Sequence, residues 1–276
     1  MMTSLPPWRR RLLAAALCLV SPWALSAPTP SLVPGGIARL SIAPASEPRP
    51  SVRFGDAPVL VLRDGTQWTA WIGLPLDLKP GKHSVAVSRQ GTASALSLTL
   101  KDKAYPVQHL RLKNQRMVEP DPADLRRIEA EAATQREVKT LFRDTDAVQL
   151  DFVTPVPGRR SSAFGLRRTF NGQPRAPHRG LDIAAGKGTP VVSPAAGVVT
   201  HVGDFFFNGN TVFIDHGQGL ISMFCHLDSV AIAAGTPIAQ GKAVGTVGQT
   251  GRATGPHLHW SVFLNGTPVD PALFLP

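Results

Sequence analysis

Cysteine is almost absent from the sequence, which has only Cys18 and Cys225 in 276 residues. Cys18 lies in an N-terminal apolar segment, so removal of that segment leaves one thiol and excludes an internal disulfide. A lone cysteine beside His226 could be a nucleophile. Neighbouring residues of a strand point to opposite faces, however. We therefore predict that Cys225 packs in the core while His226 faces a site.

Charged residues are also scarce, at 17%, and acidic residues are outnumbered by basic ones, 19 to 29. Such a composition excludes strongly charged disorder, and 25 glycines with 26 prolines favour β-structure with many turns. The net charge of +10 suits an anionic partner such as a cell-wall polymer or a membrane surface, or it serves solubility alone. The basic residues are scattered and there is a single tyrosine, so we expect no nucleic-acid partner.

The longest apolar segment near the N-terminus, Leu12 to Val20, is shorter than the ~20 residues that a transmembrane helix needs. Arg9 to Arg11 precede it, and a stretch with small residues suitable for cleavage, Ala24-Leu25-Ser26-Ala27, follows it. This order is typical of a secretory signal peptide. We predict a signal peptide over residues 1–27, export to the periplasm and no stable membrane span after cleavage. An extracellular location and an anchor formed by an uncleaved signal are the alternatives.

Residues 28–118 read as a β-rich N-terminal module. Turn signals separate short apolar or alternating runs, and Asp64-Gly65 is typical of a tight hairpin. Strands at this spacing predict a small β-sandwich. The expected strands are Ile37–Ile42, Val59–Leu62, Gln67–Ile72, His83–Val87, Ala95–Leu100 and Gln108–Leu112.

A helical connector is expected over residues 119–152. Asp121 is a suitable N-cap for a helix from about Pro122 to Phe142, and an apolar stripe predicts packing against one of the domains.

The remaining residues, 153–276, form short β-runs between glycines and contain six of the eight histidines. The expected strands are Val191-Val192, Gly197–His201, Thr211–Asp215, Ile221–His226, Val244–Val247 and Leu258–Leu264. Imidazole is the commonest zinc ligand, and a β-domain does not need so many histidines for its core. This region is therefore the candidate site of chemistry.

His257 and His259 are two residues apart, so in a strand both side chains point to the same face. His178 is followed four residues later by Asp182. A catalytic zinc normally has three protein ligands and one open position, which His178, Asp182 and His259 could provide. His257 could then take a proton from the attacking water, and His226 could donate to an oxyanion. A structural zinc site and a coincidental clustering of histidines are the alternatives.

The order of these motifs resembles that of the lysostaphin-type (LytM-type) zinc metallopeptidases, over about Val153 to Phe274. The matching strings are Ser161-Ser162-Ala163-Phe164-Gly165-Leu166-Arg167-Arg168, Pro177 to Ala184, Gly188-Thr189-Pro190-Val191, Asp215-His216-Gly217, His226-Leu227 and Gly251 to His259. Phe224 departs from the family, in which many members have a tyrosine at this position. Residues 28–118 more loosely resemble the β-rich module that precedes such domains in exported members.

The resemblance implies a mainly β protein whose domain 153–276 is an antiparallel β-structure with zinc (Zn2+) at the floor of an open groove. Family metal ligands fall on His178, Asp182 and His259, and family catalytic histidines fall on His226 and His257. The implied activity is hydrolysis of peptide cross-links or stems of peptidoglycan. A wall-binding regulator that activates other peptidoglycan hydrolases is the alternative function. The N-terminal module could cover the groove or direct the enzyme to its substrate, and any regulatory partner is unidentified.

Overall fold

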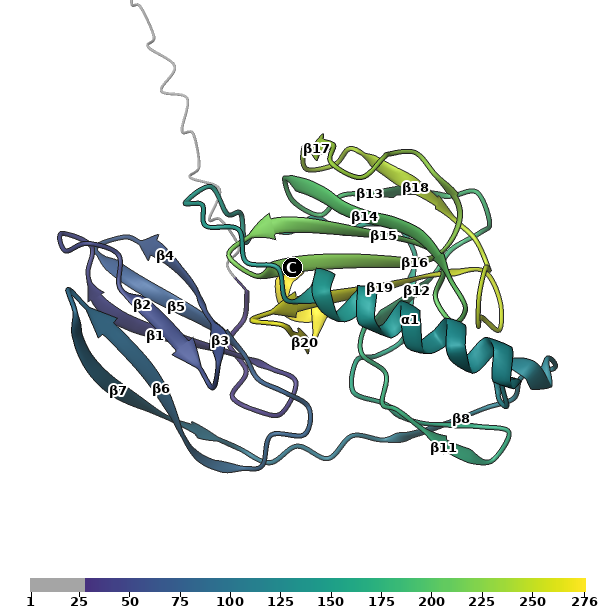
Figure 1. Cartoon of the computed structure of the whole chain (residues 1–276), viewed down its shortest axis with the longest axis horizontal. Helices are drawn as coiled ribbons and strands as arrows, with labels where there is room; N and C mark the ends of the chain where they lie inside the picture. The colour runs from purple at the N-terminus through teal and green to yellow at the C-terminus, as the bar shows by residue number, and fades with distance from the viewer. Residues whose placement is uncertain (1–27) are drawn as a thin grey trace, which may run out of the picture.

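The computed structural model describes residues 28–276, and the predicted signal peptide lies outside this part. The described chain forms two β-rich lobes side by side, with one long helix along the C-terminal lobe (Figure 1). The prediction of a mainly β protein is confirmed. Within residues 28–276 no helix is both long and apolar enough to cross a membrane.

The elements follow one another in a mostly β order. The strands before the helix are β1 (Ile37–Pro44), β2 (Ser51–Phe54), β3 (Ala57–Pro58), β4 (Leu60–Asp64), β5 (Gln67–Gly73), β6 (Gly81–Arg89), β7 (Thr92–Leu100) and β8 (Val107–Leu110). The helices are η1 (Gln115–Met117), α1 (Pro122–Lys139) and η2 (Pro271–Phe274). The strands after α1 are β9 (Arg159–Ser162), β10 (Arg167–Phe170), β11 (Gln173–Arg175), β12 (Leu181–Ala184), β13 (Pro190–Val192), β14 (Gly197–Phe205), β15 (Gly209–Gly217), β16 (Leu220–Val230), β17 (Pro237–Ile238), β18 (Ala243–Val247), β19 (His257–Leu264) and β20 (Thr267–Val269).

The N-terminal lobe contains two small sheets, ordered β1-β5-β4 and β3-β2-β6-β7. Apolar residues of both sheets, among them Ile72, Leu74 and Val85, form a shared buried cluster. The hairpin predicted at Asp64-Gly65 joins β4 to β5, with Asp64 paired to Gln67 and Gly65 at a φ of 58°. The predicted strand at Gln108–Leu112 appears as β8, but β8 pairs in parallel with β10 and lies outside these two sheets.

The C-terminal lobe is organised on one large sheet. Its central order is β17-β14-β15-β16-β19-β12-β9, and all of these pairings are antiparallel. Side chains alternate across β19, so Leu258, Trp260 and Val262 enter the main core on one face. The opposite face carries His257, His259 and Phe263.

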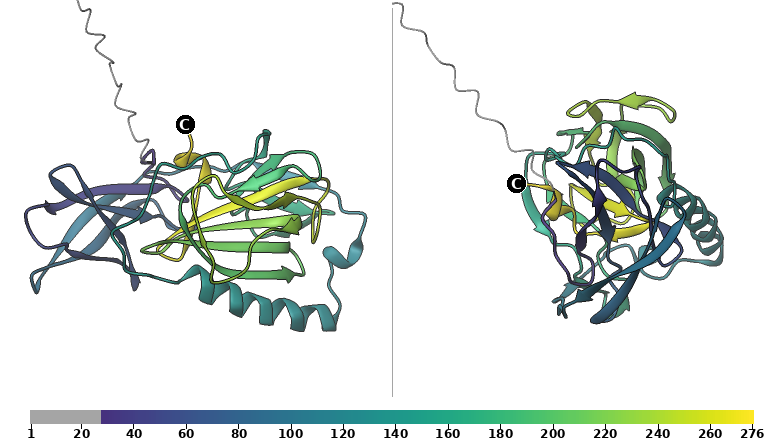
Figure 2. Two further views of the ribbon diagram at one scale, coloured as in Figure 1. Left: turned by 90° about the horizontal axis from the view of Figure 1, so that it is seen from above. Right: turned by 90° about the vertical axis from the view of Figure 1, so that its left-hand side faces the viewer.

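Helix α1 covers part of that second face (Figure 2). Val138 of α1 joins Phe213, Met223, Cys225 and Phe263 in a separate buried cluster. The helix begins as predicted, because the Asp121 side chain accepts hydrogen bonds from the backbone N–H groups of Ala123 and Asp124. It ends at Lys139, three residues before the predicted Phe142.

The apolar stripe predicted for α1 is only partly used for packing. Leu125 is 53% exposed. Polar contacts hold the helix instead, because Glu131 accepts from the Phe206 N–H at 2.8 Å and Arg127 pairs with Asp204 at 3.2 Å. The part of the sheet face that α1 leaves uncovered carries the site described below.

The two lobes share apolar and polar contacts. Trp71 and Leu60 of the N-terminal lobe belong to the same buried cluster as Leu264 and Phe274. Asn265 donates to the Gly73 carbonyl at 3.1 Å and accepts from the Gly73 N–H at 2.6 Å. The shared apolar cluster and these hydrogen bonds favour a fixed arrangement of the two lobes.

The buried His216 is expected to make the folding stability of the C-terminal lobe fall in acid. Its ring is buried, its Nδ1 lies 2.8 Å from the Ala196 carbonyl, and burial lowers its pKa from 6.5 to about 4. Below pH 6.5 the unfolded chain therefore binds a proton that the folded chain rejects, so stability falls as the pH falls from about 6.5 to about 4. The loss attributable to this ring is on the order of 3 kcal/mol.

Urea unfolding of chelator-treated protein at several pH values in this window measures the effect. A His216→Gln variant is expected to show a shallower fall in unfolding free energy than the wild type. Identical pH slopes for the two proteins would contradict this assignment.

Candidate metal centre

Three strands of the large sheet bring the candidate residues together. In β19 the side chains of His257 and His259 point to one face, as their spacing predicts. Asp182 of β12 pairs directly with His259, and residues paired across neighbouring antiparallel strands share a face. His178 comes from the loop before β12, and His226 comes from β16 on the other side of β19.

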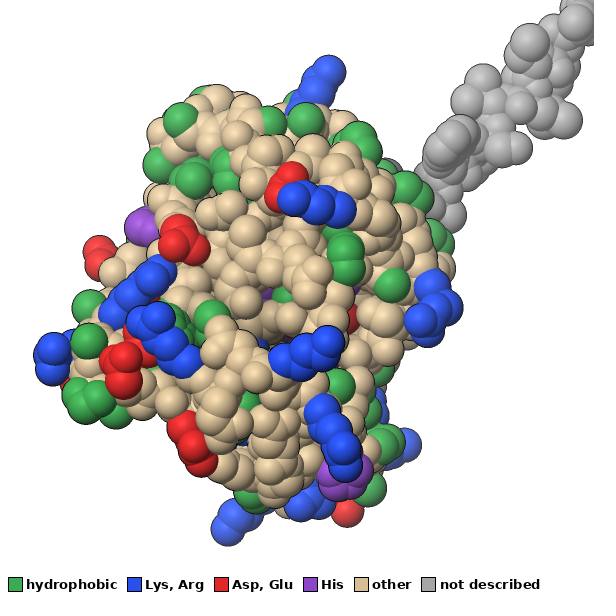
Figure 3. All heavy atoms as spheres, turned by 90° about the vertical axis from the view of Figure 1, so that its right-hand side faces the viewer, with side chains coloured by type: hydrophobic (Ala, Val, Ile, Leu, Met, Phe, Trp, Pro, Cys, Tyr) green, Lys and Arg blue, Asp and Glu red, His purple; other side chains and the backbone are tan. Residues whose placement is uncertain are grey.

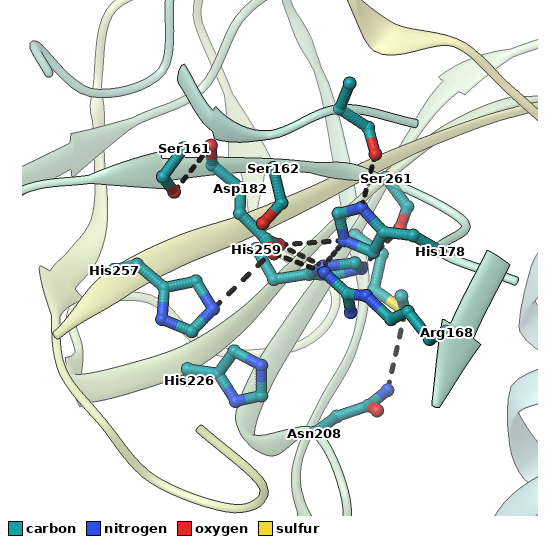
Figure 4. A network of polar contacts seen from close by, with 12 residues as sticks. Ser161, Ser162, Arg168, His178, Asp182, Asn208, His226, His257, His259 and Ser261 are labelled. Carbon is teal, nitrogen blue, oxygen red and sulfur yellow. Dashed lines mark hydrogen bonds and ion pairs between the residues drawn. The ribbon is translucent and has the colours of Figure 1, made fainter. Parts of the chain in front are cut away.

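Three polar atoms converge at the centre of this group (Figure 4). His178 Nε2 lies 2.9 Å from Asp182 Oδ1 and 3.0 Å from His259 Nδ1, and Asp182 Oδ1 lies 2.8 Å from His259 Nδ1. Among residues 28–276 these three side chains form the one group with a ligand atom from each within 4.8 Å of the others. They are the three residues predicted as metal ligands.

The hydrogen-bond partners of the two rings indicate which nitrogen carries a proton. His178 Nδ1 lies 2.7 Å from the Ala163 carbonyl, which can only accept, so Nδ1 is the donor and Nε2 presents its lone pair. His259 Nε2 lies 3.0 Å from the Ser261 hydroxyl, which can accept its proton and leave Nδ1 bare. Two nitrogen lone pairs and a carboxylate oxygen then face one another, an arrangement that a bound cation stabilises.

The protonation states agree with this arrangement. Burial lowers the pKa of His259 to about 4, although Asp182 opposes the shift, so the ring is neutral at pH 7. Burial alone would raise the pKa of Asp182, but its contacts with His178 and His259 outweigh that effect and hold it well below its usual range. Neutral imidazoles and an ionised carboxylate are the forms that bind zinc.

Arg168 ends one of the matching strings, but the sequence did not indicate that it contacts this centre. Its guanidinium donates to Asp182 Oδ2 at 2.7 Å, which leaves Oδ1 toward the histidines. Arg168 is itself held by Gln108 of β8, whose side-chain oxygen accepts at 3.0 Å. The segment between the N-terminal sandwich and α1 therefore contributes to the orientation of Asp182.

His226 and His257 lie next to the three converging residues, with ring centroids 4.8 Å apart. Each places Nδ1 2.8 Å from a backbone carbonyl, that of Thr250 for His226 and that of Gly255 for His257. Because a carbonyl only accepts, both Nε2 atoms present lone pairs. His257 Nε2 lies 3.9 Å from Asp182 Oδ1. Burial, followed by the influence of His257 and His259, lowers the pKa of His226 to about 3.

The reasoning that assigned Cys225 and His226 to opposite faces is wrong. Cys225 pairs with His259 in register and is buried among side chains on the same face as the site. The register with β15 shifts between Phe224 and Leu227, and His226 has a φ of 63°, which turns its side chain into the site. Cys225 is buried as predicted, and burial raises the pKa of its thiol to about 12. A protonated, buried thiol is a poor nucleophile.

A groove opens over His178, His226 and His259. Its walls include Gln135 and Lys139 of α1, and residues 28–104 of the N-terminal lobe contribute no lining side chain. The remaining lining residues include Arg168, Phe170, His178, Arg179, Phe207, His226, Arg252 and His259. Figure 3 shows histidine atoms at the bottom of a hollow with Lys and Arg side chains around it.

Gly180 packs so closely against this centre that a side chain at its position would not fit. A Cβ at this position would lie 2.7 Å from the His259 ring and 2.7 Å from Ser261 Oγ. A Gly180→Ala variant must therefore displace the ring that provides Nδ1. We expect zinc affinity to fall about 10- to 100-fold, the effect typical of disturbing a ligand's supporting contacts.

Competition with a fluorescent chelator measures that affinity. Gly186→Ala is a suitable comparison, because Gly186 does not have a positive φ and its Cβ would meet only Thr189 Oγ1, at an ordinary contact distance of 3.8 Å. Wild-type zinc affinity in Gly180→Ala would contradict the steric argument.

Comparison with known proteins agrees with this geometry. Residues 176–271 match the model of peptidase family M23, and residues 31–103 match that of the peptidase family M23 N-terminal domain. A crystal structure from Pseudomonas aeruginosa, assigned to peptidase M23, is 40% identical, with a TM-score of 0.74 over 88% of this chain and 95% of that one. The chain belongs to peptidase family M23. The resemblance to lysostaphin-type peptidases and the prediction of a peptidase are thereby confirmed.

Curated M23 relatives match over a shorter region. The DD-carboxypeptidase/endopeptidase Mpg of Neisseria meningitidis is 42% identical over 113 residues, which is 41% of this chain and 26% of that protein. The peptidoglycan DD-endopeptidase ShyC of Vibrio cholerae is 41% identical over 121 residues, 43% of this chain and 28% of that protein. The aligned region thus spans about a quarter of these relatives.

Proposed function

We propose that this chain is an exported zinc endopeptidase that hydrolyses peptide cross-links or stems of peptidoglycan. The convergence of His178 Nε2, Asp182 Oδ1 and His259 Nδ1 within 3.0 Å of one another carries the proposal. The names of the relatives Mpg and ShyC support a peptidoglycan peptide as the substrate. The basic groove and the predicted signal peptide are consistent with an anionic wall polymer outside the cytoplasm.

The residues present fit a zinc ion. Two imidazole nitrogens and one carboxylate oxygen are a ligand set that catalytic zinc uses, and each ring is oriented by a second hydrogen bond. His178, Asp182 and His259 would hold the ion. When bound, zinc would polarise the scissile carbonyl and increase the acidity of a coordinated water.

His257 is the proposed general base. Its Nδ1 proton is committed to the Gly255 carbonyl, so Nε2 is free to take a proton from the attacking water. The Asp182 carboxylate, 3.9 Å from Nε2, stabilises the imidazolium that results. The same proton can pass to the amide nitrogen when the carbon–nitrogen bond breaks, which returns His257 to its neutral form.

His226 is the proposed partner of His257. Its low pKa keeps it neutral at pH 7, and Nδ1 is held by the Thr250 carbonyl. Its Nε2 can therefore donate toward the oxyanion only after taking up a proton, and the available source is the second proton of the attacking water, which His257 does not accept. This adds a condition to the donor role expected from the sequence.

Mass spectrometry of cross-linked peptidoglycan fragments tests the proposed function. The zinc-loaded chain from residue 28 is expected to convert dimeric peptides to monomers, and the mass of each product identifies the bond cleaved. Unchanged dimers after incubation with zinc-loaded, folded protein would contradict the proposal. The alternative, a regulator without activity of its own, then predicts faster cleavage when a second wall hydrolase is added.

A further inference from the structure

Arg252 is a cation on the groove wall without an acidic partner. It lines the groove together with His226 and His259. Within residues 28–276, its guanidinium makes no ion pair, and its side-chain hydrogen bond is a long one, 3.5 Å from Nη1 to the Met117 carbonyl. Most of its donors are therefore available to a ligand.

Aromatic side chains fix the orientation of this guanidinium. The Arg252 guanidinium carbon lies 4.0 Å from the ring centroid of Phe207 and 4.6 Å from that of Phe170. Stacking leaves the donor edge of the planar group free, so the fork is pre-organised for a carboxylate. Arg252 also donates its backbone N–H to the Phe207 carbonyl at 2.8 Å, which ties the two residues together.

The backbone at Arg252 is coupled to the catalytic histidine. Gly251 has a φ of 69°, and a Cβ there would lie 2.4 Å from the Gly209 nitrogen, so this turn is packed closely. The preceding residue, Thr250, holds His226 Nδ1 through its carbonyl. One short segment therefore sets the position of both the His226 ring and the Arg252 guanidinium.

The electrostatics of the groove favour an anion beside Arg252. Burial, followed by the nearby charges of Arg168 and Arg175, lowers the pKa of Arg252 to about 10, so it remains charged at pH 7. The lining residues include Lys139, Arg168, Arg179 and Arg252 but no aspartate or glutamate. Arg168 is already paired with Asp182. A partly desolvated guanidinium without a carboxylate is stabilised when a ligand provides one.

We propose that Arg252 is a specificity-determining residue that binds a free carboxylate of the peptide substrate near the scissile bond. This inference rests on the proposed function. The carboxylate could be that of the diamino acid at the cross-link, or the C-terminal carboxylate of the stem peptide. Both present the same planar acceptor, which matches the fork of an arginine held between two rings.

Three synthetic cross-linked peptides with the same scissile bond test this inference. One has both carboxylates free, and each of the others has one of them converted to the amide. Calorimetric binding to chelator-treated protein compares them without turnover, and hydrolysis by zinc-loaded protein gives kcat and KM. We expect one of the amides to bind about 10- to 100-fold more weakly, the cost of losing hydrogen bonds to a charged group.

Variants of Arg252 assign the preference to this residue. Arg252→Met should bind the peptide with both carboxylates free as weakly as the wild type binds the amide peptide for which it has lower affinity. Arg252→Lys keeps the charge but loses the fork, so an intermediate preference is expected and provides a readout if the Met variant does not fold. Arg126→Met, on the exposed surface of α1, should retain the wild-type preference.

Equal binding of all three peptides by the wild type would overturn the inference, as would a preference that persists in folded Arg252→Met. If a preference that depends on Arg252 is found but no peptide is cleaved, the inference stands and the proposed endopeptidase activity fails. If all three peptides are cleaved with equal kcat/KM and bound with equal affinity, the proposed endopeptidase activity stands and the inference about Arg252 fails.

Discussion

A His257→Ala variant is expected to hydrolyse cross-linked peptides about 10²- to 10⁴-fold more slowly than the wild type, the range for loss of a positioned general base. The physical reason is that Nε2 of this ring presents a lone pair, does not belong to the three converging atoms, and lies 3.9 Å from the carboxylate that would stabilise the imidazolium. Zinc affinity should stay near the wild-type value. Steady-state hydrolysis and chelator competition on the same preparation measure both quantities.

His83→Ala is the matched control for that variant. His83 lies in the N-terminal lobe, where its Nε2 contacts the Lys79 carbonyl at 2.8 Å, and it is not a groove residue. The control should retain wild-type activity and zinc affinity. A folded, zinc-loaded His257→Ala protein with wild-type kcat would contradict the role assigned to this ring.

An Asp182→Asn variant is expected to lose zinc binding, with affinity at least about a thousandfold lower, a larger effect than the 10- to 100-fold cost of disturbing a ligand's supporting contacts. The amide has nearly the same shape but lacks the negative charge. The negative charge of the Asp182 carboxylate attracts both the bound cation and Arg168, which donates to Oδ2 at 2.7 Å. Without it, Arg168 would lie beside the bound metal with no counter-charge.

Equilibrium dialysis with zinc measures the loss, and hydrolysis should fall below detection in the same samples. Asp56→Asn, an exposed position in the N-terminal lobe, is the comparison and should bind zinc normally. Retention of tight zinc binding by Asp182→Asn would show that Asp182 is not a ligand.

Much of the strand arrangement could be predicted from the sequence because local patterns determine it. Two-residue periodicity placed His257 and His259 on one face, and Asp64-Gly65 predicted a hairpin that the structure confirms. The N-cap of α1 was also readable, because Asp121 and Pro122 are local signals.

Features that depend on non-local contacts could not be predicted. The positive φ at His226 and the shift in register beside it overrule the simple alternation that was applied to Cys225. The pairing of β8 with β10 joins segments about 60 residues apart, so no local turn pattern in the sequence could indicate it. The same pairing is what brings Gln108 to Arg168.

The surroundings of the candidate site were the least predictable part. Arg252 stands in a matching motif, but its position between Phe170 and Phe207 depends on three separate segments. Gly180 is part of the His178 to Asp182 string, yet its closeness to His259 arises only when β12 pairs with β19. Sequence spacing can nominate ligands, whereas the contacts that orient them come from tertiary structure.

Crystallography of the zinc-loaded chain at the zinc absorption edge tests the central claim most directly. We expect one anomalous peak per chain, about 2.0–2.2 Å from His178 Nε2, His259 Nδ1 and a carboxylate oxygen of Asp182. His226 and His257 should remain outside bonding distance. A peak bonded to either of those two rings, or the absence of a peak in crystals grown with zinc, would contradict it.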